Sequence, residues 1–104
     1  MKLMYGYLFI DDYGTKIELS NKEALLLECL QKNNVATPKI IFEYVYKDDF
    51  DKYDESLNGS IKTLVCRLRK RLKGIVNIYT KYNIGYFLDE NTSIDLVNNE
   101  IYRR

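Results

Sequence analysis

The chain has 104 residues with a formal net charge of +1, and 46% of its residues are hydrophobic. This length fits one small domain, and the composition is that of a folded protein without a membrane span. The chain contains no histidine, which excludes the commonest general base and most zinc sites, and Cys29 and Cys66 lack a metal-binding spacing. Since the N-terminus also lacks the pattern of a signal peptide, we expect a cytoplasmic protein with reduced thiols and no cofactor.

The charge is distributed unevenly along the chain. Residues 1–55 carry 7 basic and 11 acidic side chains, residues 56–88 carry 7 basic and no acidic ones, and residues 89–104 carry 2 basic and 4 acidic ones. The three segments therefore contribute −4, +7 and −2 to the net charge. We expect one face of the fold to attract a polyanion while the rest repels it.

Local patterns predict an alternation of strands and helices. In chain order, the expected elements are strands at 4–10 and 16–19, helices at 21–32, 38–46 and 57–72, and a hairpin of strands at 75–80 and 85–88. Ser20 and Glu23 have the spacing of a capping box at the start of the first helix. Thr37 is the expected N-cap of the second helix, with Pro38 at its first position, and Gly74 ends the third.

The last residues have a weaker pattern. From Thr92 onward, Ile94, Val97 and Ile101 recur at helical spacing, which weakly favours a helix. We therefore divide the chain into a domain at 1–90 and a C-terminal tail at 91–104. The tail docks either on its own domain or on a second copy, and the sequence leaves both open.

The order of elements indicates the fold class. A short N-terminal β-sheet, three helices and a C-terminal β-hairpin wing are typical of an α+β winged helix-turn-helix. In this layout the third helix can enter a major groove of DNA, and the hairpin can reach the neighbouring backbone.

The third predicted helix separates an apolar stripe from a polar strip. The apolar stripe comprises Leu57, Ile61, Leu64, Val65, Leu68 and Leu72. Ser60, Thr63, Arg67 and Lys70, the polar strip, lie between about 100° and 180° from Ile61 around the helix. Arg69 and Lys73 flank the stripe. A solvated face with cations near the helix C-terminus is the alternative, but 6 cations between Lys62 and Lys73, without an acidic residue, favour nucleic acid.

Four segments resemble one known family in the right order. Leu19–Leu30 is similar to its first helix, Val35–Tyr46 to its second, and Ser60–Leu72, with the sequence RLRK, to its recognition helix. Ile78–Thr80 and Gly85–Phe87 are similar to its hairpin. The chain thus resembles the OmpR/PhoB-type winged-helix DNA-binding domain, the C-terminal effector domain of bacterial two-component response regulators. A receiver domain does not fit in this length, so we expect a fragment or a stand-alone regulator.

The resemblance implies roles for individual residues. Arg67 falls where the family reads bases, and Arg69 and Thr80 fall at its phosphate-contacting positions. The Arg in the family's wing is replaced here by Tyr82, beside Lys81 as a substitute cation. The full set of expected DNA-binding residues is Ser60, Thr63, Arg67, Arg69, Lys70, Lys73, Thr80, Lys81 and Tyr82. Because only about twenty residues precede the first helix, where the family has a four-stranded sheet, a strand is expected to be missing.

The expected function is that of a sequence-specific transcriptional regulator, not an enzyme, which binds double-stranded DNA as a homodimer. The acidic loop Lys47–Glu55 falls where the family contacts RNA polymerase, with Phe50 and Tyr53 as candidate anchors. The alternative for this loop is a solvated connector whose aromatic side chains pack onto the core, which we favour. For the whole chain, the alternative is a winged-helix protein-interaction module without DNA binding.

Overall fold

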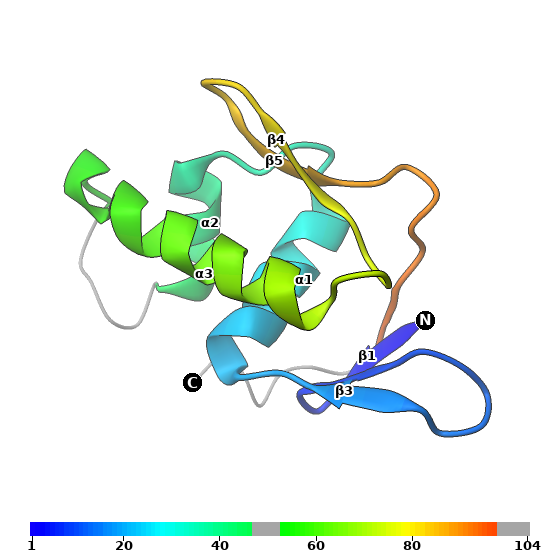
Figure 1. Cartoon of the computed structure of the whole chain (residues 1–104). Helices are drawn as coiled ribbons and strands as arrows, with labels where there is room; N and C mark the ends of the chain where they lie inside the picture. The colour runs from blue at the N-terminus through cyan, green and yellow to red at the C-terminus, as the bar shows by residue number, and fades with distance from the viewer. Residues whose placement is uncertain (47–52, 98–104) are drawn as a thin grey trace.

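The computed structural model describes residues 1–46 and 53–97. The elements are β1 (Lys2–Met4), β2 (Tyr7–Phe9), β3 (Lys16–Glu18), α1 (Asn21–Lys32), α2 (Pro38–Val45), a 3₁₀ turn η1 (Glu55–Leu57), α3 (Asn58–Arg71), β4 (Ile78–Lys81), β5 (Gly85–Leu88) and β6 (Asp95–Leu96). The helices lie between the N-terminal sheet and the β4–β5 hairpin, which projects on the opposite side (Figure 1). This is the expected α+β winged helix-turn-helix. Within the described ranges, no helix is long and apolar enough to cross a membrane.

The N-terminal strand prediction needs a correction. The run expected as one strand at 4–10 is a hairpin, in which β1 pairs antiparallel with β2 and Met4 lies opposite Tyr7. Tyr5 and Gly6 form the turn between them, with φ angles of 51° and 85°. These left-handed values suit a tight two-residue hairpin turn, and Gly6 adopts its value without strain.

The strand expected to be missing is supplied by the tail. The sheet has 4 strands in the order β3-β2-β1-β6, and β6 runs parallel to β1. The Asp95 N–H donates to the Met1 carbonyl oxygen at 2.9 Å, and the Val97 N–H donates to that of Leu3 at 3.0 Å. The helical expectation is therefore wrong for Asp95–Leu96, because the free edge of β1 offers backbone partners that an isolated short helix lacks. Ile101 lies outside the described residues.

The predicted helix starts at Ser20 and Thr37 are confirmed by their capping contacts. The Glu23 N–H donates to Ser20 Oγ at 3.2 Å and the Ser20 N–H donates to Glu23 Oε1 at 2.8 Å, which completes the capping box. Thr37 Oγ1 accepts from the Ile40 N–H at 3.2 Å at the start of α2. The C-cap of α3 is Leu72 rather than Gly74, which lies in the turn that follows and has a left-handed φ of 81° that favours glycine.

One apolar core joins the sheet, the helices and the tail. Leu3 and Leu8 from the sheet, Leu26 from α1 and Leu68 from α3 are fully buried in it. Cys29 on α1 is also buried, and the loss of hydration raises the pKa of its thiol to about 12. Cys29 therefore packs as a small apolar side chain.

The hairpin is attached to the segment between α1 and α2. The Ala36 N–H donates to the Tyr86 carbonyl oxygen at 2.8 Å, and the Tyr86 N–H donates to that of Ala36 at 2.9 Å. The first hairpin strand begins at Ile78 rather than at residue 75, because the N–H groups of Ile75 and Val76 still bond back to the Leu72 carbonyl oxygen. The hairpin is thereby held beside α3, where it can contribute to a shared surface.

Candidate nucleic-acid interface

The polar strip of α3 lies on the surface. Ser60, Thr63, Arg67 and Lys70 are all exposed, whereas the apolar stripe is buried in the core except for Leu57, which is partly buried. Thr63 Oγ1 donates its proton to the Gly59 carbonyl oxygen at 3.0 Å, so the hydroxyl is engaged with its own helix. The strip therefore offers a methyl group and an acceptor at Thr63 and freely accessible cations at Arg67 and Lys70.

The side chain of Arg69, a residue of α3, reaches from the helix to the hairpin. Its Nε–H donates to the Ile78 carbonyl oxygen at 3.0 Å, and its Nη2 donates to Thr80 Oγ1 at 2.7 Å. The guanidinium carbon lies 5.7 Å from the centre of the Tyr86 ring. The structure thus brings together Arg69 and Thr80, which the sequence predicts as phosphate contacts, and shows that they are also partners of each other.

The other expected contacts lie at the end of α3 and at the tip of the hairpin. Lys73, Lys81 and Tyr82 are exposed, and 84% of the Tyr82 surface is accessible. The tip turns at Asn83, whose φ is 60°, and is closed by a 2.9 Å bond from the Ile84 N–H to the Lys81 carbonyl oxygen. The tip therefore presents one aromatic ring and one cation to the solvent.

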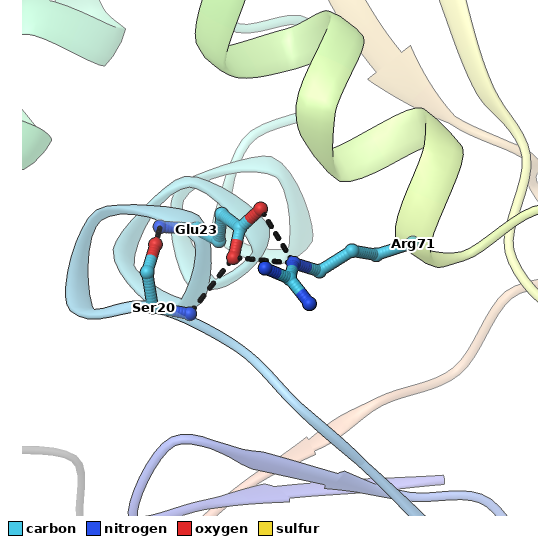
Figure 2. A network of polar contacts seen from close by, with 3 residues as sticks. All are labelled: Ser20, Glu23 and Arg71. Carbon is cyan, nitrogen blue, oxygen red and sulfur yellow. Dashed lines mark hydrogen bonds and ion pairs between the residues drawn. The ribbon is translucent and has the colours of Figure 1, made fainter.

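The sequence prediction missed an ion pair that joins α1 to α3. The Arg71 Nε lies 2.9 Å from the carboxylate of Glu23, which also caps α1 through Ser20 (Figure 2). Only 2% of the Glu23 surface is exposed. The helical period places Arg71 near the edge of the apolar stripe, which indicates that it can contact a neighbouring element. It does not identify the partner, which lies 48 residues earlier. Arg71 therefore holds α3 against α1 rather than extending the polar strip.

The pKa of Glu23 decides how this pair responds to pH. Burial alone would raise that pKa, but hydrogen bonds from the Ser20 N–H and from Arg71 outweigh burial and lower it from its ordinary value of 4.5. Since the folded-state pKa lies below the unfolded one, the carboxylate stabilises the fold above pH 4.5. This stabilisation is lost as the pH falls through the folded-state pKa.

The first expected result concerns Arg71→Ala. This variant should lower the free energy of unfolding at neutral pH by about 2 kcal/mol, because the buried Glu23 carboxylate loses a charged partner. It should also raise the pKa of Glu23 and weaken the acid-induced loss of stability, as urea unfolding across the acidic range can measure. Lys73→Ala removes the same charge from the exposed end of this segment and serves as the control. Equal effects of the two variants would contradict a structural role for the ion pair.

At the described end of the acidic loop, the Tyr53 side chain packs inward. The Tyr53 ring lies 5.7 Å from that of Phe42, and its hydroxyl donates to Asn58 Oδ1. This confirms, for Tyr53, that the aromatic side chain packs onto the core. Phe50 and the rest of 47–52 lie outside the described residues.

Comparisons with known proteins agree with this architecture. A family model described as "Transcriptional regulatory protein, C terminal" matches residues 14–88. The structure resembles the DNA-binding domain of Bacillus subtilis CssR, with a TM-score of 0.58 and 24% identity over 80% of this chain and 99% of that one. It also resembles the C-terminal domain of the nisin resistance regulator NsrR, a lantibiotic response regulator, with a TM-score of 0.60 and 21% identity over 86% of this chain and 97% of that one.

These identities show a shared fold, and a comparison with curated proteins gives no match. The family match spans most of the described chain, including all three helices and the hairpin. The chain therefore belongs to the OmpR/PhoB-type family of transcriptional regulatory protein C-terminal domains, which are DNA-binding domains.

Proposed function

We propose that the chain binds double-stranded DNA in a sequence-specific manner, with α3 in the major groove and the β4–β5 hairpin on the adjacent backbone. The polar strip carries this proposal, because its members are exposed together on a helix that has no carboxylate. A major groove about 12 Å wide accommodates one α-helix. The hairpin lies beside α3 (Figure 1) and is joined to it by the hydrogen bond from Arg69 to Ile78, which supports the proposal that it contacts the adjacent backbone.

The chemistry of each side chain suggests its role. Arg67 can donate two parallel hydrogen bonds to O6 and N7 of guanine. Because the Thr63 hydroxyl proton is bonded to Gly59, its methyl group is the part that suits a thymine methyl. Lys70 and Lys73 suit phosphates, which set the register without reading the sequence.

Family membership suggests two further partners. We propose that two copies bind paired half-sites, since family membership implies dimers on DNA and helix-turn-helix dimers read half-sites one helical turn apart. For the loop at 47–55, the family resemblance implies a contact with RNA polymerase, whereas the packing of Tyr53 on Phe42 favours the connector at the described end of the loop. Phe50 is the remaining candidate anchor in this loop, since Tyr53 packs on Phe42.

The expected result for Arg67→Ala is a loss of about 1–3 kcal/mol in binding to a duplex selected by the wild-type chain, together with relaxed sequence preference. Lys70→Ala is the matched control, since it removes one exposed cation of the same strip. It should weaken all duplexes alike and reduce the salt slope by about 1. For the wild type, the logarithm of affinity should fall against that of salt with a slope of about −0.9 per phosphate neutralised. Fluorescence anisotropy with selected and random duplexes at several salt concentrations measures the affinity, the sequence preference and the salt slope.

The outcomes separate the competing interpretations. Unchanged binding of Arg67→Ala to the selected duplex would show that the polar strip does not read bases. If the wild-type chain binds no duplex at low salt, the protein-interaction module becomes the better interpretation. Half-site spacing among the selected duplexes reports whether two copies bind together.

A further inference from the structure

We propose that Arg69 is a positioning residue that sets the angle between α3 and the β4–β5 hairpin, and thereby the distance between the groove contact and the backbone contact on DNA. The DNA part of this inference rests on the proposed function. The geometry itself is a property of the free protein and can be tested without DNA.

The contacts of Arg69 all point from α3 to the hairpin. Its guanidinium bonds to two successive acceptors along β4, the backbone oxygen of Ile78 at 3.0 Å and the hydroxyl of Thr80 at 2.7 Å. These residues lie 9 and 11 positions later in the chain, across the turn that follows α3. One side chain thus fixes both the position of β4 along α3 and its rotation toward α3.

The same guanidinium also reaches β5. Its carbon lies 5.7 Å from the Tyr86 ring centre, within cation–π range, and 8% of the Tyr86 surface is exposed. Tyr86 in turn pairs through its backbone with Ala36, just before α2. The hairpin is therefore held on two sides, by Ala36 at β5 and by Arg69 at β4. Without Arg69, the strand that leads to the exposed tip would lose its side-chain hydrogen bonds to α3.

Only an arginine meets these requirements. The planar fork presents several N–H groups in fixed directions, so it can bond to a carbonyl oxygen and a hydroxyl at once while its face lies over a ring. A lysine ammonium keeps the charge but is a compact group on a flexible chain, and it cannot reproduce this set of contacts. Arg69→Lys therefore separates the positioning role from the charge.

A fixed angle matters because DNA must contact α3 and the hairpin simultaneously. If the hairpin is free to rotate, ordering it on binding opposes affinity, whereas a pre-positioned hairpin avoids this loss. The gain is greatest on a duplex that α3 reads in one register. On a random duplex α3 is not held in one register, so the hairpin can meet the repeating phosphates from many positions and its exact position matters less.

The experiment compares Arg69→Lys and Thr80→Val with the wild-type full chain. Thr80→Val keeps the β-branched shape and removes only the hydroxyl, whereas Thr80→Ser keeps the hydroxyl. Arg71→Lys is the control for Arg69→Lys, because it also replaces an arginine of α3 with lysine. Amide hydrogen exchange in the free protein should become about tenfold faster in β4 for Arg69→Lys and Thr80→Val. Affinity for a duplex selected by the wild type should fall about tenfold, and affinity for a random duplex by less than about twofold. Thr80→Ser and Arg71→Lys should resemble the wild type in exchange of β4.

The possible results differ clearly. If Arg69→Lys matches the wild type in both exchange and affinity, Arg69 has no positioning role and the inference is overturned. It is also overturned if Arg69→Lys is harmless while Arg69→Ala weakens all duplexes equally and lowers the salt slope, since Arg69 would then be a phosphate contact alone. Failure of the wild type to bind any duplex would overturn the proposed function and the DNA part of this inference, while exchange in the free protein still decides whether Arg69 positions the hairpin.

Discussion

Gly85→Ala is expected to destabilise the fold by about 3 kcal/mol, because it forces a new carbon into a backbone contact. A Cβ at Gly85 would lie 2.2 Å from the carbonyl oxygen of Ala36 and 2.8 Å from its carbonyl carbon. These are backbone atoms and cannot rotate away as the end of a side chain can. To make room, β5 must move from Ala36, which breaks the paired bonds between Ala36 and Tyr86. Urea unfolding measures the loss, and hydrogen exchange at the Ala36 amide shows whether the hairpin has detached.

Gly59→Ala is the matched control for this prediction. A Cβ at Gly59 meets nothing within 4 Å, and the residue lies in the first turn of α3. Alanine favours a helix over glycine, so this variant should be as stable as the wild type or more stable by up to about 1 kcal/mol. Equal stability of the Gly85 and Gly59 variants would mean that β5 does not approach Ala36 this closely. The pairing with Ala36 would then not be one of the two attachments that hold the hairpin beside α3.

The helices could be predicted well because their signals are local. Ser20 and Glu23 lie within one helical turn of each other, and the apolar period of α3 arises within one segment. The turn at Tyr5 was hidden because tyrosine rarely adopts a left-handed φ, and Gly6 alone interrupts an otherwise apolar and aromatic run. The strand β6 depends on the free edge of β1, more than 90 residues earlier, and its own two residues carry no signal that identifies this partner.

The same distinction applies to the candidate site. The exposure of Arg67 and Lys70 follows from the helical period, since burial of the opposite face decides which residues remain outside. The helical period also places Arg69 at the edge of the apolar stripe, but it could not identify Ile78 and Thr80 as partners on another element. The sequence therefore indicates which cations face the solvent, whereas the three-dimensional packing decides which of them are already engaged.

Ile94→Ala is expected to lower the free energy of unfolding by about 3 kcal/mol, because shortening a buried aliphatic side chain loses apolar burial and leaves a cavity. Only 3% of the Ile94 surface is exposed, and the residue belongs to the same core as Leu3 of β1 and Leu68 of α3. Ser93→Ala is the control, because Ser93 is exposed and the substitution keeps its backbone intact. Its effect should stay within about 0.5 kcal/mol.

Urea unfolding at two protein concentrations adds the decisive comparison for the tail. If Ile94 packs within its own chain, the loss caused by Ile94→Ala is the same at both concentrations. If the tail instead docks on a second copy, the wild-type stability rises with concentration and the variant loses that dependence. Equal stability of the Ile94 and Ser93 variants would show that the tail lies outside the core. The pairing of β6 with β1 would then contribute little, and a domain ending at residue 90 would be the better description.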